Sequence, residues 1–258
     1  FPAGPETLHS TTLGWRMVNP RMPAEWTISL GECTELLAEK YGISRSAQDE
    51  FALASHQKAA AAWTAGAFAA EVVPINELER DEGIRADTSL AALAKLKPAF
   101  RPDGTVTAGN ASPLNDGAAA LLIGDRSAAE RAGKQPLARI VSRAVAALEP
   151  QYFGIGPVAA AERALARAGL DWSELALVEL NEAFAAQSLA CLADWPELDP
   201  AIVNVHGGAI AIGHPLGCSG ARILGHLAHA LHGRGGGYGL AAICIGVGQG
   251  LAVVLEAC

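Results

Sequence analysis

The chain has 258 residues, of which 50% are hydrophobic and 18% are charged, and its formal net charge is −8. A chain of this length and apolar content buries a substantial core in one or two domains, which excludes an intrinsically disordered protein. The acidic balance and the lack of a long basic run argue against a nucleic-acid partner.

Two further features concern where the protein resides. The five cysteines are scattered without CxxC spacing, which argues against a disulfide framework or a zinc ribbon and predicts a cytoplasmic protein. The uncharged stretch 235–255 is long enough to cross a bilayer, but its glycines favour two strands joined by a turn at 246–250, so we expect no membrane partner.

The start Phe1-Pro2-Ala3-Gly4 shows neither an initiator methionine nor a signal-peptide pattern, and we expect the chain to begin inside a longer parent.

The first hundred residues predict a helical, loop-rich subdomain. Residues 1–30 are punctuated by prolines and are expected to be irregular. Glu32–Tyr41 predicts a helix that ends at Gly42, and a longer helix follows from about Ser46 to Ala65, with Ser46 and Asp49 as a capping box. The remaining predicted elements of this part are an extended piece at 70–75 and a helix at 88–97.

Beyond residue 104, extended segments alternate with helices. The predicted strands are 105–108, 118–123, 138–148, 175–180, 202–205, 238–245 and 251–255. The predicted helices are 127–132, 157–168, 182–192 and 219–231. Alternation of this kind predicts an α/β fold with a mostly parallel sheet covered by helices on both faces. Ligands of such sheets bind where strands end and helices begin.

Three polar side chains follow predicted strands near the C-terminal end of the chain. Asn181 comes directly after the strand 175–180, His214 lies in a glycine-rich loop, and Cys244 lies at the end of the strand 238–245. Each has an ordinary explanation when taken alone: a helix N-cap, an exposed loop histidine and a buried structural cysteine. Convergence of all three on one pocket favours a chemical site, because an imidazole and a thiol on glycine-rich loops suit acyl transfer.

The spacing of His226, His229 and His232 places them along one side of a predicted helix. No carboxylate or cysteine joins them at ligand spacing, so we expect no metal site. We interpret them as residues on the polar face near the C-terminus of the helix.

These motifs together resemble the thiolase family, and the resemblance covers nearly the whole chain. The matching segments are NEAFAAQ at 181–187, GGAIAIGHPLG at 207–217, CIGVGQG at 244–250, TAGNASPLNDG at 107–117 and EKYGISRSAQDEFAL at 39–53. The resemblance implies a layered α/β/α fold with a mixed, mostly parallel sheet, a helical loop subdomain and an incomplete first half. It divides the chain into a loop subdomain that covers coenzyme A (1–104), the end of the first half (105–136) and the second half (137–258).

The resemblance also implies the reaction. Thiolases interconvert a 3-ketoacyl-CoA plus CoA with a shortened acyl-CoA plus acetyl-CoA through a cysteine thioester, a step of fatty-acid metabolism. It implies coenzyme A and acyl-CoA as substrates, no permanently bound cofactor, and a homodimer or homotetramer of the full-length parent.

Site residues follow from the same resemblance. His214 matches the histidine that activates the nucleophilic thiol and helps to bind the thioester oxygen, and Asn181 matches the residue that holds a water in that oxyanion hole. Cys244 matches the cysteine that moves the α-proton of acetyl-CoA, and Gly246 matches the donor of a second oxyanion site. The residues that match the lining of the CoA site are Arg85, Phe100, Ala108, Ser112, Ala183 and Phe184.

Two departures from the family pattern limit these expectations. The acyl-accepting cysteine of the family has no counterpart, since neither Cys33 nor Cys218 lies in its sequence context. Ser29-Leu30-Gly31-Glu32 stands where biosynthetic members show His-Met-Gly, which favours a broader 3-ketoacyl-CoA thiolase. We therefore expect the C-terminal portion of a thiolase-type acyltransferase that is inactive by itself. The alternatives are a non-catalytic CoA-binding or scaffold remnant and a relative of the sterol-carrier thiolases.

Overall fold

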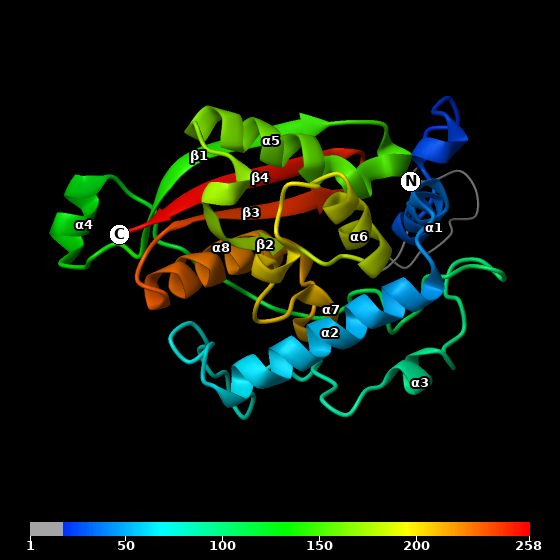
Figure 1. Cartoon of the computed structure of the whole chain (residues 1–258), viewed down its shortest axis with the longest axis horizontal. Coiled ribbons are helices and arrows are strands. Elements are labelled where there is room, and N and C mark those ends of the chain that lie inside the picture. The colour runs from blue at the N-terminus through cyan, green and yellow to red at the C-terminus, as the bar shows by residue number, and fades with distance from the viewer. Residues whose placement is uncertain (1–17) are drawn as a thin grey trace, which may run out of the picture.

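A four-stranded sheet in the order β1-β4-β3-β2 forms the centre of the second half of the chain (Figure 1). The computed structural model describes residues 18–258, and its strands are β1 (Ala138–Ala147), β2 (Leu175–Leu180), β3 (Tyr238–Ile245) and β4 (Gln249–Ala257). The predicted strands at 175–180 and 238–245 are confirmed, and the uncharged stretch 235–255 forms most of a β-hairpin. No helix among residues 18–258 is long and apolar enough to span a membrane.

The direction of the strands corrects one expectation. The α/β class and the mixed sheet are confirmed, but the sheet is not mostly parallel. Among the four strands of residues 18–258, only β2 and β3 pair in parallel, whereas β3–β4 and β4–β1 are antiparallel. The reason is local: β3 and β4 are joined by a tight turn in which Val247 and Gly248 take positive φ angles of 68° and 77°, and strands joined so closely must run antiparallel.

Helices cover both faces of this sheet, as predicted. Helix α5 (Gly156–Ala168) packs on one face and α8 (Leu216–Gly233) on the other. Because side chains alternate along a strand, Leu240 and Ala242 of β3 join the core under α5, whereas Ala241 joins the core under α8. Full burial of a leucine side chain such as Leu227 contributes about 2 kcal/mol to stability.

Capping residues define the helices of the first hundred residues. Helix α1 (Leu30–Tyr41) begins where Ser29 accepts a hydrogen bond from the N–H of Glu32, and it ends at Gly42, whose φ is 64°. Helix α2 (Arg45–Thr64) follows. The predicted capping box of Ser46 and Asp49 is wrong, since Ser44 caps α2 by accepting from the N–H of Ala47.

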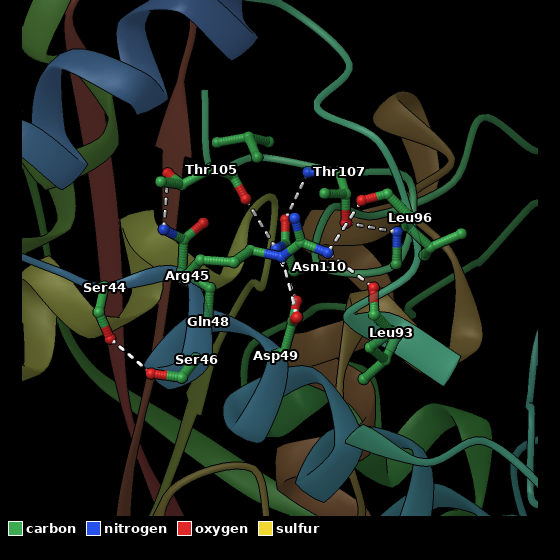
Figure 2. A network of polar contacts seen from close by, with 12 residues as sticks. Ser44, Arg45, Ser46, Gln48, Asp49, Leu93, Leu96, Thr105, Thr107 and Asn110 are labelled. Carbon is green, nitrogen blue, oxygen red and sulfur yellow. Dashed lines mark hydrogen bonds and ion pairs between the residues drawn. The ribbon is translucent and has the colours of Figure 1, made fainter. Parts of the chain in front are cut away.

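Asp49 instead forms part of a polar network between helices and loops, which Figure 2 shows. It is buried and joins α2 to the segment 105–110: its Oδ2 accepts from Nε of Arg45 at 2.9 Å, and its Oδ1 accepts from Nδ2 of Asn110 at 3.0 Å. Arg45 also donates to the carbonyl of Leu93 at 2.6 Å, beside α3 (Leu90–Leu93). A polar network therefore joins α2, α3 and the segment 105–110.

Several predicted elements differ from the structure. Residues 118–123 belong to no strand within the described residues, and their Leu122 is 93% exposed. A segment becomes a stable strand only when it finds a partner, whereas this one contacts α8, with Leu121 beside Gly225. The expected helix at 88–97 is reduced to the single turn of α3.

The expected strand at 202–205 is a 3-10 turn, η4 (Pro200–Ile202), followed by one isolated parallel bridge between Val178 and Val203. The expected helix at 182–192 is α6 (Ala185–Ala193), because Phe184 is extended. The remaining helical elements are α4 (Arg126–Ala132), α7 (Ala209–Ile212), η1 (Ala24–Trp26), η2 (Pro150–Ile155) and η3 (Trp172–Glu174). Of the irregular segment expected at 1–30, residues 1–17 lie outside the described residues.

Candidate functional site

The carboxyl ends of β2 and β3 bring two of the predicted residues to one edge of the sheet. Asn181 follows β2 directly, and its N–H donates to the carbonyl of Ala242 at 2.9 Å, which continues the parallel pairing. Cys244 lies two residues beyond Ala242 on β3. Neighbouring parallel strands lie about 4.8 Å apart, so Asn181 and Cys244 lie at the same end of the sheet.

His214 reaches this edge from the turn between α7 and α8 rather than from a strand. Its Nε2 lies 3.4 Å from Nδ2 of Asn181, and its backbone N–H donates to Oδ1 of Asn115 at 2.8 Å. The preceding Gly213 has a φ of 88°, and a Cβ there would lie 2.5 Å from the amide of Asn115. The position therefore requires glycine, which explains the glycine directly before the histidine.

A serine that the sequence motif did not single out determines the tautomer of His214. Nδ1 of the ring lies 2.6 Å from Oγ of Ser219, and Oγ in turn donates to the carbonyl of Pro215 at 3.2 Å. A hydroxyl has only one proton, and both the carbonyl of Pro215 and the NH2 group of Asn181 opposite Nε2 favour the arrangement in which Nδ1 donates to Ser219; we assign the Nδ1–H tautomer on this basis. The lone pair of Nε2 then faces Asn181.

The surroundings of His214 keep its ring neutral. Burial, together with the nearby positive charge of Arg222, lowers the pKa of His214 to about 4. At neutral pH the ring is therefore an unprotonated imidazole with a free Nε2, which is the form that a general base requires.

Asn181 is itself buried, and one atom of its amide lacks a partner. Oδ1 has no hydrogen-bond partner among the described residues, although it is shielded from solvent. An unpaired buried amide oxygen is costly unless a water or a ligand donates to it. The site thus offers an acceptor beside the imidazole.

Cys244 lies in an apolar environment that it shares with a second cysteine. Its buried neighbours are Cys33, Phe153 and Ala183, and Phe184 packs against them. Burial raises the pKa of Cys244 to about 12 and, as the largest of several effects, that of Cys33 to about 11. Both thiols are protonated at neutral pH, which suits a proton donor better than a nucleophile.

Glu182 is a buried carboxylate next to Asn181 that the sequence motif did not single out. It accepts from Oγ of Ser55 at 2.6 Å, from Nδ2 of Asn204 at 2.8 Å and from the N–H of Ile210 at 3.2 Å. A Cβ at Gly208 would lie 2.3 Å from the carboxyl carbon. The Glu182 side chain joins the end of β2 to α2 and α7. In the sequence, the adjacent glycines 207 and 208 are the signal that could have indicated such a close approach.

Four of the residues expected to line a CoA site lie together. The N–H and Oγ of Ser112 both donate to the carbonyl of Ala183, at 3.0 and 2.9 Å. The rings of Phe100 and Phe184 meet edge to face with centroids 6.2 Å apart. Because Ala183 also belongs to the apolar cluster around Cys244, these four residues adjoin the candidate site.

The other expected residues lie apart from these contacts. Arg85 is exposed, and its hydrogen bonds run to Nδ1 of His56 and the carbonyl of Glu82. Ala108 is exposed in the turn at 107–110. Gly246 is half-buried in the turn after β3, where Leu30 is the nearest neighbour of its missing Cβ, at 3.9 Å.

The surface in front of His214 is an open pocket. It is lined by Leu114, Asn115, Asp116, His214 and Leu216. Asn181 and Cys244 do not line this pocket, and both are buried. The structure thus brings Asn181 into contact with His214 and places Cys244 at the same edge of the sheet, but it does not join all three in one open cavity.

One of the three histidines of α8 differs from the expectation, whereas His229 is half-buried and His232 is exposed. His226 is buried and not on a polar face: its Nδ1 lies 2.5 Å from Oε1 of Glu71, and its Nε2 lies 3.0 Å from Nδ1 of His206. Burial acts to lower the pKa of His226, but the contact with Glu71 and the charges of Glu179 and Glu71 raise it overall. No group of three or more His, Cys, Asp or Glu side chains within residues 18–258 is placed to hold a metal ion.

Sequence models of known families match most of the chain. The thiolase N-terminal domain matches residues 17–127, and the thiolase C-terminal domain matches residues 134–257. The chain is 48% identical over 259 residues to a β-ketoadipyl-CoA thiolase of Pseudomonas putida, a match that covers 96% of this chain and 65% of the relative. It is 52% identical over 237 residues to an acetyl-CoA acetyltransferase of Rhizobium meliloti (strain 1021), covering 88% of this chain and 60% of that protein.

Solved structures agree with these matches. The acetyl-CoA acetyltransferase of Bacillus anthracis superimposes with a TM-score of 0.86 at 46% identity, covering 90% of this chain and 61% of that chain. Human mitochondrial 3-ketoacyl-CoA thiolase in complex with CoA superimposes with a TM-score of 0.85 at 45% identity, covering 90% and 60%. The chain thus spans about two thirds or less of the length of these relatives: 65%, 60%, 61% and 60%.

Proposed function

This chain belongs to the thiolase family, and from that premise we propose that it carries the second half of the site of a thiolase-type acyltransferase. The proposed substrates are a 3-ketoacyl-CoA and CoA, or two acyl-CoA molecules in the reverse direction. The relatives named for β-ketoadipyl-CoA and for acetyl-CoA differ in acyl group, and we propose a 3-ketoacyl-CoA thiolase without narrower acyl specificity.

In cleavage, a cysteine thiolate attacks the C3 carbonyl, the C2–C3 bond breaks, and C2 receives a proton to give acetyl-CoA. The thiol of CoA then takes the acyl group from the enzyme thioester, and the enzyme thiol is released. The cycle needs one group that takes the proton of the attacking thiol, donors for the developing oxyanion, and an acid for C2.

The described residues fit these roles. The free Nε2 of His214 accepts the proton of the attacking thiol and, once protonated, donates to the thioester oxygen. Asn181 lies 3.4 Å from that nitrogen and keeps an unpaired Oδ1, which suits a water held in the oxyanion hole. The protonated thiol of Cys244 is the proposed acid for C2, and the N–H of Gly246 is the proposed second oxyanion donor.

The contact between Asn181 and His214 carries this proposal. Their ring and amide meet at the carboxyl end of β2 although 33 residues separate them in the chain. A neutral imidazole next to an amide oxygen without a protein partner leaves that oxygen available to a water or a ligand beside the base.

We also propose how coenzyme A is held. Phe100, Ser112, Ala183 and Phe184 would border the pantetheine and the acyl end, and the exposed Arg85 and Ala108 would lie further out toward the nucleotide. The proposed loop subdomain (1–104) would cover the ligand, next to the end of the first half (105–136) and the second half (137–258). We propose that the enzyme is cytoplasmic, forms homodimers or homotetramers and acts in fatty-acid metabolism.

The acyl-accepting thiol is the part of this machinery that these residues do not supply. Cys33, Cys191, Cys218 and Cys244 are buried, and burial raises the pKa of each. Cys258 is exposed at the end of β4. We propose that the 258 residues alone cannot complete the cycle.

Acetyl-CoA binding and acyl-enzyme formation test the two parts of this proposal separately. Calorimetry of the 258-residue chain with acetyl-CoA is expected to show binding that Phe184→Ala weakens, with the exposed Leu90→Ala as control. Mass spectrometry after incubation with labelled acetyl-CoA is expected to show no acylated cysteine. Lack of binding would contradict the acyltransferase assignment, and an acyl-enzyme on this chain would contradict its inactivity.

The reading frame upstream of these residues distinguishes the alternative of a CoA-binding or scaffold remnant. A continuous frame that encodes a cysteine-bearing first half supports the enzyme. A frame without it, together with acetyl-CoA binding that His214→Gln leaves unchanged, would favour the remnant.

A further inference from the structure

Arg222 lies nearly two turns into α8 and is half-buried, and its guanidinium reaches the turn that carries His214. Its Nη2 donates to the carbonyl of Gly213 at 2.9 Å, and its Nη1 makes a longer contact of 3.5 Å with the carbonyl of Ile212. These two carbonyls are the last ones before His214. They also end α7, where the carbonyls have no partner within the helix.

The conformation of this turn requires such a partner. Gly213 takes a φ of 88° and a ψ of 166°, which few residues other than glycine adopt. Asn115 lies on one side of Gly213, and the carbonyl of Gly213 is directed toward Arg222 of α8. A planar guanidinium has donors spaced to meet neighbouring acceptors, whereas the single ammonium group of a lysine does not.

Acidic groups, most of them from other elements, act on the charge of Arg222. Burial lowers the pKa of Arg222, and the charges of Cys218, Asp81, Glu179 and Glu182 act in the opposite direction. Glu179 lies on β2, and Glu182 follows Asn181. Arg222 therefore bonds to the turn before His214, and the acidic side chains on either side of Asn181, Glu179 and Glu182, act on its charge, although burial raises the pKa of both.

We propose that Arg222 is a positioning residue for His214, which holds the Gly213 carbonyl so that Nε2 of the imidazole faces Asn181. The inference rests on the proposed function of His214. Arg222 does not touch the proposed reacting atoms, and it acts through the backbone of the turn and through its charge. Among the groups around His214, Asn181, Ser219 and Asn115 are neutral, Asp116 lines the open pocket, and Arg222 is the cation that acts on the ring.

The test separates the two effects of Arg222 with two substitutions. Arg222→Gln removes both the positive charge and the paired guanidinium donors. Arg222→Lys keeps the positive charge but lacks the paired donors. The 258-residue chain is labelled with 15N-histidine, the His214 ring signals are assigned with His214→Gln, and amide hydrogen exchange is measured at Gly213 and His214. Arg234→Gln is the matched control, because Arg234 is exposed at the other end of the same helix.

We expect Arg222→Gln to raise the pKa of the His214 ring by about one pH unit and to speed amide exchange at Gly213 and His214 by about tenfold. Arg222→Lys should leave the ring pKa close to that of the wild type and still speed the exchange. Arg234→Gln should change neither quantity.

The inference is overturned if Arg222→Gln behaves like Arg234→Gln in both measurements. If circular dichroism shows that Arg222→Gln does not fold, Arg222→Lys decides the matter through the exchange rates alone, and unchanged rates overturn the inference. Neither readout needs turnover, so failure of the positioning role is distinct from failure of the proposed function, which the acetyl-CoA binding experiment reports.

Discussion

The Nδ1 of His214 lies 2.6 Å from the hydroxyl of Ser219, one turn further along the start of α8. In the assigned arrangement Ser219 donates its proton to the carbonyl of Pro215, and the imidazole carries its own proton on Nδ1. The side of the ring that faces Asn181 is therefore the basic one. A buried serine on the helix after the histidine thus decides which chemistry the histidine can perform.

Replacement of this serine should remove the preference of the His214 ring for the Nδ1–H tautomer. In Ser219→Ala the Nδ1–H loses its partner, and we expect a mixture of the two neutral tautomers in the 15N shifts of the His214 ring. We also expect a loss of stability of about 1 kcal/mol in urea unfolding, because a buried donor is left unpaired. Ser127→Ala, on the exposed helix α4, is the control and should change neither. A single Nδ1–H tautomer in Ser219→Ala would show that another contact selects it.

Stability should depend on pH through His214. The folded-state pKa of about 4 lies below the ordinary value of 6.5, so the unfolded state binds the proton more readily between these values. The stabilisation is complete above pH 6.5 and is lost as the pH falls toward 4. Allowing for the partial exposure of the ring, we expect a loss of about 2 kcal/mol relative to His214→Gln.

Urea unfolding of both proteins at pH 7 and pH 4.5 measures this difference. Other groups titrate equally in the two proteins and cancel in the comparison. Equal losses in the wild type and in His214→Gln would mean that His214 is not held neutral by its surroundings.

Glu182 should matter for stability more than an exposed glutamate. Glu182→Gln turns one acceptor into an NH2 group, which must face either the amide of Asn204 or the donors from Ser55 and Ile210. An unmatched donor at a buried position costs about 1–3 kcal/mol. Urea unfolding at pH 7 should show this loss, whereas Glu162→Gln, an exposed change on α5, should stay within about 0.5 kcal/mol of the wild type. Equal midpoints for the two variants would mean that Glu182 is not held as an acceptor.

The cysteines should react in a definite order. Cys258 is exposed, whereas Cys244 and Cys33 are buried with raised pKa values of about 12 and about 11. With iodoacetamide at pH 7.5, we expect Cys258 to be alkylated at least about 100-fold faster than Cys244, since the thiolate is the reactive form. Peptide mass spectrometry follows each site, and all five cysteines should react in urea. Fast labelling of Cys244 in the folded chain would contradict the proposed role as a protonated acid.

Features that depend on neighbouring residues could be predicted from the sequence. The strands at 175–180 and 238–245 were located correctly because short apolar runs are bounded by glycine, proline or polar residues. Helices α1 and α5 end at Gly42 and Gly169, whose left-handed conformations favour glycine. The motifs around Asn181, His214 and Cys244 likewise indicated the family, because glycine-rich turns with a fixed order of polar residues are specific.

Features that depend on contacts between distant parts of the chain could not be predicted from the sequence. Residues 118–123 have the composition of a buried strand, yet no strand of the described residues pairs with them, and the pairing partner of a strand is not encoded in the strand itself. The same holds for Glu182, whose donor Ser55 lies 127 residues away.

The sequence by itself determined where several elements lie, such as α1, α5, β2 and β3, and which residue types carry acid–base chemistry, since these depend on local backbone preferences and side-chain type. Tertiary structure alone decided that Asn181 meets His214, that Ser219 selects the tautomer and that burial keeps the imidazole neutral and Cys244 protonated. Hydrogen bonds and desolvation act over a few ångströms in space, and only the folded chain brings together groups so far apart along it.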